Sequence, residues 1–181
     1  MKKLECIDVE ACDEAADWAS GKTWEEVYST CHRGDWLLWL FKRTNPDNLR
    51  ELTLAKGHCA NTFRHLMTDK RSLKAVDAAI RYGNNEATDE ELAASCKAAY
   101  TTYVNIADAN AEVYYASYAA YDYTAAVTSN ATAYAASNAA DYAATDYTAV
   151  GVGYAIAVNQ KLTADICRKY LPLEIWNQSL L

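Results

Sequence analysis

The stretch from Ala98 to Val158 most strongly limits what this chain can fold into. It has no Lys or Arg, and no Gly or Pro occurs from Asn84 to Val150. Because Ala is the strongest helix former and helix breakers are absent, a helix that starts here has no local reason to stop. One continuous helix would be roughly 100 Å long. We therefore expect a reversal, which gives a long Ala/Tyr-rich helical hairpin.

Two places favour an interruption of this stretch. β-Branched and capping residues cluster at Val127-Thr128-Ser129-Asn130, where a new helix could begin. Two glycines follow at Gly151-Val152-Gly153, and glycine weakens a helix. We predict the reversal at the first place and a second break at the glycines.

A heptad spacing within the stretch predicts close helix packing. Tyr100, Ala107, Tyr114 and Tyr121 lie seven residues apart, and small residues alternate with aromatic ones. Such a row can close a hairpin through Tyr–Asp and Tyr–Asn hydrogen bonds, and it can equally pair two chains as a homodimer. A Tyr-rich face can also bind a partner. The candidate residues for that face are Tyr114, Tyr118, Tyr121 and Asp122.

The whole chain is predicted to be one all-α domain, a helical bundle. With 51% apolar and 23% charged residues over 181 positions, it can bury a core. We divide residues 1–181 into a part with short helices (1–87), the long Ala/Tyr-rich helices (88–171) and a C-terminal tail (172–181). Thr23 with Glu26 and Thr88 with Glu91 match the capping box that begins a helix.

The composition also limits location and class. Asp, Asn and Thr interrupt every window long enough to span a membrane, so no membrane association is expected. Acids follow Lys2 and Lys3 before any apolar run, unlike in a signal peptide, and a cytoplasmic protein is expected. A net charge of −7 argues against general nucleic-acid binding.

The segment Arg33-Gly34-Asp35-Trp36 is the most specific local pattern. We predict that Gly34 adopts a conformation forbidden to other residues and that Asp35 caps a buried, apolar helix beginning at Trp36. A turn plus a helix cap would explain the tripeptide by itself. Alternatively, Arg33 and Asp35 form an ion-paired lip of a pocket lined by Trp36 and Trp39.

Basic residues gather in the middle of the chain, between acidic regions. These zones can attract one another within the fold, or part of the basic zone can receive an acidic protein or a phosphate. The candidate cations of a phosphate site are Arg33, Lys56, Arg64 and Arg71.

Motifs for catalysis or cofactors were not found. The sequence has no Gly-rich phosphate loop, nucleophile elbow or HExxH motif, and its six cysteines form no CxxC pair. Cys31 and His32 are adjacent, so on a helix they would point apart. We expect no enzyme activity, no metal and no cofactor, and we expect reduced cysteines.

Several blocks together resemble a family. The chain is similar to the immunity proteins of phage and bacterial genomes in four segments. These are the block Arg-Gly-Asp-Trp-Leu-Leu-Trp-Leu (33–40), the helix 49–56 with His58-Cys59-Ala60, the segment 71–80 and the Ala/Tyr/Asp-rich tail. The resemblance covers nearly the whole chain. It implies a small cytosolic protein that neutralises a toxin by binding it.

Three functions follow from these observations. The first is a non-enzymatic, immunity-type inhibitor that binds a protein partner such as a toxin. The second is a phage counter-defence protein that sequesters a nucleotide signal, using the four cations above with Trp36 or Trp39 stacked on a base. The third is a structural, homo-oligomeric helical protein.

Overall fold

The computed structural model describes residues 11–62, 64–67, 69–105 and 149–176. These residues form α-helices and short 3-10 helices and contain no β-strand, so the all-α prediction is confirmed. The helices are α1 (Asp13–Ala19), α2 (Trp24–Thr30), α3 (Gly34–Thr44), α4 (Leu49–Asn61), α5 (Lys70–Gly83), α6 (Asp89–Asn105) and α9 (Ala149–Tyr170), with 3-10 turns η2 (Arg64–Leu66) and η3 (Leu173–Ile175).

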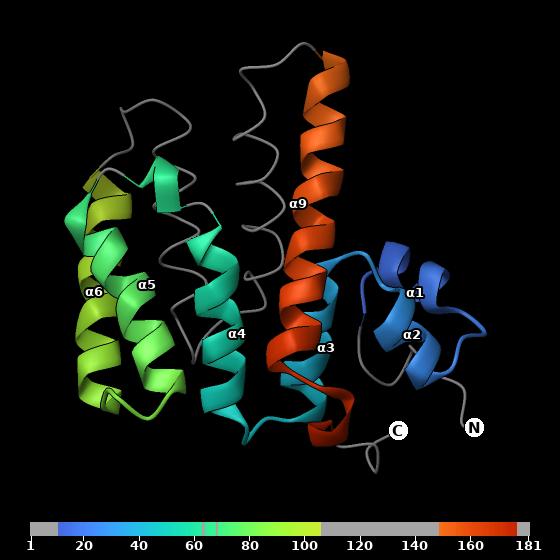
Figure 1. Cartoon of the computed structure of the whole chain (residues 1–181), viewed down its shortest axis with the longest axis horizontal. Coiled ribbons are helices and arrows are strands. Elements are labelled where there is room, and N and C mark those ends of the chain that lie inside the picture. The colour runs from blue at the N-terminus through green and yellow to red at the C-terminus, as the bar shows by residue number, and fades with distance from the viewer. Residues whose placement is uncertain (1–10, 63, 68, 106–148, 177–181) are drawn as a thin grey trace.

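The helices are arranged side by side in chain order, and α9 lies alongside α3 and α4, which also contact each other (Figure 1). α4, α5 and α6 form an up-and-down row at one end. α9 packs against both α3 and α4. The short helices α1 and α2 lie at the opposite end of the row, beyond α3.

Local signals set where several helices begin and end. The Thr23 hydroxyl accepts from the Glu26 backbone N–H at 3.3 Å, and Glu26 accepts from the Thr23 N–H at 2.7 Å. Thr88 and Glu91 make the same reciprocal pair at 3.0 and 3.2 Å. Both predicted capping boxes are confirmed. Gly21, with φ +76°, follows the end of α1, as expected for a left-handed terminator.

Glycines allow α4 and α5 to pack closely. A Cβ at Gly57 would lie 3.0 Å from the Ile80 side chain, and a Cβ at Gly83 would lie 2.8 Å from the Leu54 Cα. Each glycine thus faces the partner helix at a point where a side chain would push the two backbones apart. This reciprocal contact holds the α4–α5 pair as a unit.

The prediction of a break at Gly151-Val152-Gly153 is wrong. α9 begins at Ala149 and continues through both glycines to Tyr170. Glycine in a helix costs only about 1 kcal/mol relative to Ala, which the flanking helix formers offset. The reversal predicted at 127–130, and with it the hairpin, lies outside the described residues.

The core is closed by the C-terminal segment. α9 ends before Pro172, and Trp176 returns to the body, where it is 5% exposed. Its ring packs edge-on to Phe41, 5.2 Å between centroids, and to Tyr28, 5.7 Å. The Trp176 indole donates to the Leu171 carbonyl at 2.9 Å. This cluster joins α2, α3 and the end of α9. Among the described helices, none combines the length and apolar character needed to cross a membrane.

Candidate functional site

The Arg33–Asp35 pair stands at the beginning of α3. Arg33 donates two hydrogen bonds to the Asp35 carboxylate, from Nε at 2.9 Å and from one terminal nitrogen at 2.6 Å. The Asp35 side chain is only 5% exposed. The hydrogen bond to Asp35 raises the pKa of the Arg33 guanidinium. Because two parallel charge-assisted bonds form, the pair is a fixed feature of this end of the helix.

Asp35 is therefore not the predicted helix cap. α3 begins at Gly34, its N-cap position is Arg33, and no side chain caps it. A carboxylate engaged by a guanidinium through two charge-assisted bonds gains more than it would from one backbone N–H. The Asp35 side chain turns to Arg33 for that reason, within the first turn of the helix.

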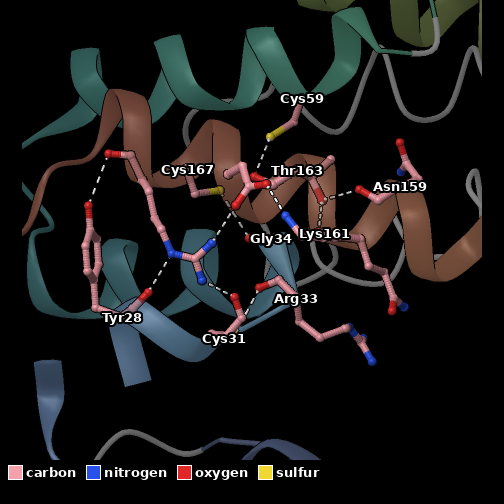
Figure 2. A network of polar contacts seen from close by, with 12 residues as sticks. Tyr28, Cys31, Arg33, Gly34, Cys59, Asn159, Lys161, Thr163 and Cys167 are labelled. Carbon is pink, nitrogen blue, oxygen red and sulfur yellow. Dashed lines mark hydrogen bonds and ion pairs between the residues drawn. The ribbon is translucent and has the colours of Figure 1, made fainter. Parts of the chain in front are cut away.

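Gly34 is required for a close approach and not for its backbone angle. The positive-φ glycine among the described residues is Gly21, so the conformation predicted for Gly34 is wrong. A Cβ on Gly34 would lie 2.6 Å from the backbone carbonyl carbon of Thr163 in α9. The Cys167 thiol donates to the Gly34 carbonyl at 3.4 Å. Figure 2 shows Thr163, Cys167 and Cys59 around this crossing.

An apolar cleft lies between α1, α2 and α3. It has a volume of about 30 Å³ and is partly open to solvent. The wall is almost wholly apolar and is formed by Ala11, Ala15, Trp18, Ala19, Val27, Cys31, Trp36, Leu37, Trp39 and Leu40. Both predicted pocket tryptophans, Trp36 and Trp39, are in this wall, and the Arg33–Asp35 pair is adjacent in sequence to Trp36.

Aromatic rings and two cations surround one side of the cleft. Trp18 lies 5.8 Å from Trp36 and 6.3 Å from His32, between ring centroids, and His32 lies 6.4 Å from Trp36. The Arg33 guanidinium lies 4.6 Å from the Trp36 ring and the Lys22 ammonium 4.2 Å from the Trp18 ring. Cations over indole faces are favourable, so both charges are held against the aromatic rim.

The α2 wall of the cleft is fixed by Arg168 of α9. Arg168 donates to the Tyr28 carbonyl at 2.8 Å and also to the Cys31 carbonyl. The Tyr28 hydroxyl donates to the Arg168 carbonyl at 3.1 Å. The contacts of Tyr28 and Cys31 are drawn in Figure 2. These bonds satisfy carbonyls at the end of α2, where a cation is favoured, and connect that helix to α9.

The other predicted cations do not join Arg33. Lys56 is 2% exposed in α4. Arg64 pairs with Asp77 at 2.6 Å and Arg71 with Asp69 at 2.8 Å. Arg64 and Arg71 belong to η2 and α5, which lie across α4 from α3. The four cations thus do not converge on one phosphate. Tyr114, Tyr118, Tyr121 and Asp122 lie outside the described residues.

Three buried thiols lie beside the site. Cys31, Cys59 and Cys167 are at most 1% exposed. Burial raises the pKa of Cys31 to about 11 and raises the pKa of Cys167, which also contacts Cys59. The raised pKa values keep the Cys31 and Cys167 thiols protonated at neutral pH, so these two act as small core groups. Within the described residues, no three His, Cys, Asp or Glu side chains form a group that could hold a metal ion.

Sequence reasoning about the site missed the contribution of α1. Trp18, Ala15 and Ala11 supply one wall, and Glu14 reaches Arg33 at 3.5 Å. The available signal was the helical spacing of Ala11, Ala15 and Trp18, which predicts a buried stripe. That spacing does not say which helix the stripe faces.

Comparisons of the chain with protein-family models, with curated proteins and with solved structures found no match.

Proposed function

We propose that this protein is a non-enzymatic binding protein that holds a partner protein at the cleft between α1, α2 and α3. The observation that carries the proposal is the partly open, apolar cleft walled by Trp18, Trp36 and Trp39. Tryptophan and arginine are the residues most enriched among those that dominate binding energy at protein interfaces. Here Arg33 is held over the Trp36 ring at the edge of the same cleft.

The cleft suits a side chain projecting from a partner. Trp36 and Trp39 are only partly buried, so contact with a partner would remove further apolar surface from water. Burying an aliphatic side chain contributes about 1.5–3 kcal/mol. The rigid wall reduces the cost of binding, because Arg168 and the Gly34 crossing hold α2 and α3 in place before a partner arrives.

The resemblance to immunity proteins supports a toxin as the partner and the cytoplasm as the place of action. In this proposal the protein neutralises the toxin by occupying its surface. We propose no nucleotide-sequestering function, since Arg33, Arg64 and Arg71 are engaged by separate carboxylates.

The test is capture of the partner from the native host with matched variants. Ala15→Leu places a larger side chain in the cleft wall, whereas Ala93→Leu makes the same change at an exposed position of α6. A stoichiometric protein companion, identified by native mass spectrometry, should bind the wild type and Ala93→Leu alike. It should bind Ala15→Leu at least tenfold more weakly, as loss of about 1.4 kcal/mol requires.

Two results would contradict the proposal. A companion that binds Ala15→Leu as tightly as the wild type would place the interface elsewhere. A homodimer without any other companion would favour the structural, self-associating alternative. Thermal unfolding of each variant, followed by circular dichroism, shows whether Ala15→Leu remains folded at the capture temperature.

A further inference from the structure

The helices that form the cleft carry a strongly acidic surface. From Ala11 to Cys31 the chain has five acids and a single base, Lys22. All five acids are exposed: Asp13, Glu14, Asp17, Glu25 and Glu26. Residues 32–83, by contrast, carry ten bases and five acids. Between residues 11 and 83 the negative charge is thus concentrated on α1 and α2, the helices that supply two walls of the cleft.

The cations at the cleft offset only part of this charge for an incoming partner. Arg33 is already engaged by the buried Asp35 and lies 3.5 Å from Glu14. Lys22 donates to the Trp18 carbonyl and lies over the Trp18 ring. The Glu14 side chain remains 73% exposed at the rim. The five acids of α1 and α2 outnumber the single base Lys22, so these helices present net negative charge to a partner.

The size of the cleft selects the group that enters it. A cavity of about 150 Å³ is known to accept a benzene ring, whereas this one measures about 30 Å³. Without rearrangement, its enclosed part has room for a small aliphatic group and not for a whole aromatic ring. The wall offers almost no polar surface, so a polar side chain would lose its hydrogen bonds to water without replacement.

We propose that the partner presents an aliphatic side chain flanked by Lys or Arg residues: the aliphatic group enters the cleft, and the flanking cations face the acids of α1 and α2. This inference rests on the proposed function and specifies the chemistry of the partner at the same site. Charge complementarity of this kind mainly raises the association rate and the specificity. The aliphatic contact supplies most of the affinity.

The test uses a random dodecapeptide library displayed on phage and selected against the full-length protein. Selected peptides are then synthesised and titrated at low and high salt against three variants. Ala15→Leu narrows the cleft. Glu14→Gln/Asp17→Asn/Glu25→Gln removes the acid at the rim and two further acids of α1 and α2 while leaving the Glu26 capping box intact. Its matched control, Asp47→Asn/Glu51→Gln/Glu86→Gln, removes the same number of exposed charges outside these helices.

The expected result is enrichment of peptides that carry Leu, Ile or Val next to Lys or Arg. Their affinity should fall at least tenfold in Ala15→Leu. In the α1/α2 charge variant the affinity should fall about three- to tenfold, which is the scale of a few exposed ion pairs. The difference in affinity between this variant and the wild type should be smaller at high salt. The control variant should bind as the wild type does.

Other outcomes separate the two proposals. Some peptides could bind Ala15→Leu more weakly and yet be acidic, or bind the α1/α2 charge variant as tightly as the wild type. Either result overturns the stated chemistry of the partner but keeps the cleft as a binding site. Peptides that bind Ala15→Leu with unchanged affinity count against the cleft itself. A library that yields no binder overturns the inference, while capture from the host still decides whether a protein partner exists.

Discussion

The replacement Gly34→Ala tests the contact on which the site depends. A Cβ at this position would lie 2.6 Å from the carbonyl carbon of Thr163, far inside normal contact. The neighbouring atom belongs to a backbone within α9, so it cannot move aside by a change of rotamer. Either α3 or α9 must shift, and Arg33 and Asp35 would shift with the beginning of α3.

Two opposing terms set the expected magnitude. Ala stabilises a helix relative to Gly by at most about 1 kcal/mol, and the first residue of α3 gains less than an interior one. Overpacking a well-packed contact costs about 1–3 kcal/mol, and the backbone clash puts this site at the upper end. We expect a net loss of about 2 kcal/mol. For a chain of 181 residues this lowers Tm by roughly 4–8 °C.

The assay is urea and thermal unfolding followed by tryptophan fluorescence and circular dichroism. Gly57→Ala is the matched control, because its Cβ would lie 3.0 Å from the nearest atom, in the Ile80 side chain, and 3.2 Å from the Ile80 backbone nitrogen, so it should cost less. Thr163→Ala should not rescue Gly34→Ala, since the Cβ and the backbone of residue 163 remain. A Gly34→Ala protein as stable as the wild type would refute the close approach of α3 and α9.

Three further predictions concern charge and protonation. Arg168→Met removes the bonds at the end of α2 and should lower the free energy of unfolding in urea by about 2–3 kcal/mol. Burial and the nearby Lys169 lower the pKa of His58 below its ordinary 6.5. Below that pH the unfolded state binds more protons than the folded state, so the free energy of unfolding should fall as the pH drops below 6.5. His58→Gln should reduce that fall. Because burial raises the pKa of Cys31 to about 11, iodoacetamide at pH 8 should alkylate Cys31 much more slowly than the exposed Cys12. Peptide mass mapping measures the two rates.

Each of these has its own control. Lys161→Met removes an exposed cation of the same helix and should change the free energy of unfolding by no more than about 0.5 kcal/mol. If Lys161→Met and Arg168→Met had equal effects, the Arg168 contacts would not be the cause. His65→Gln alters an exposed histidine, and an identical change in pH dependence would remove His58 as the cause. Rapid labelling of native Cys31 would contradict its burial, and denatured protein should label at both cysteines.

Features governed by near neighbours in the chain were predictable. The capping boxes of Thr23 and Thr88 form within a few residues, so the sequence pattern contains all the participants. The all-α class follows from helix propensity and apolar spacing in the same way. The ion pair of Arg33 with Asp35 was also accessible, since the two residues are close in sequence.

Features that depend on a distant partner were not predictable. Gly34 has an evident place in a turn motif, but its reason is the backbone of Thr163. The Cys167–Gly34 hydrogen bond joins residues 133 positions apart, and the Arg168–Tyr28 bonds join residues 140 apart. Periodicity identifies a buried face without naming what covers it.

The sequence by itself determined the helical class and the capping boxes of Thr23 and Thr88, and it offered the pairing of Arg33 with Asp35 as one of two alternatives. The tertiary structure alone decided that Trp18 of α1 joins Trp36 to form a cleft, and that Lys56 is buried while Arg64 and Arg71 pair locally. The physical reason is range. Propensity and capping act over one or two helical turns, whereas a cleft exists only where side chains from several helices meet and leave space between them.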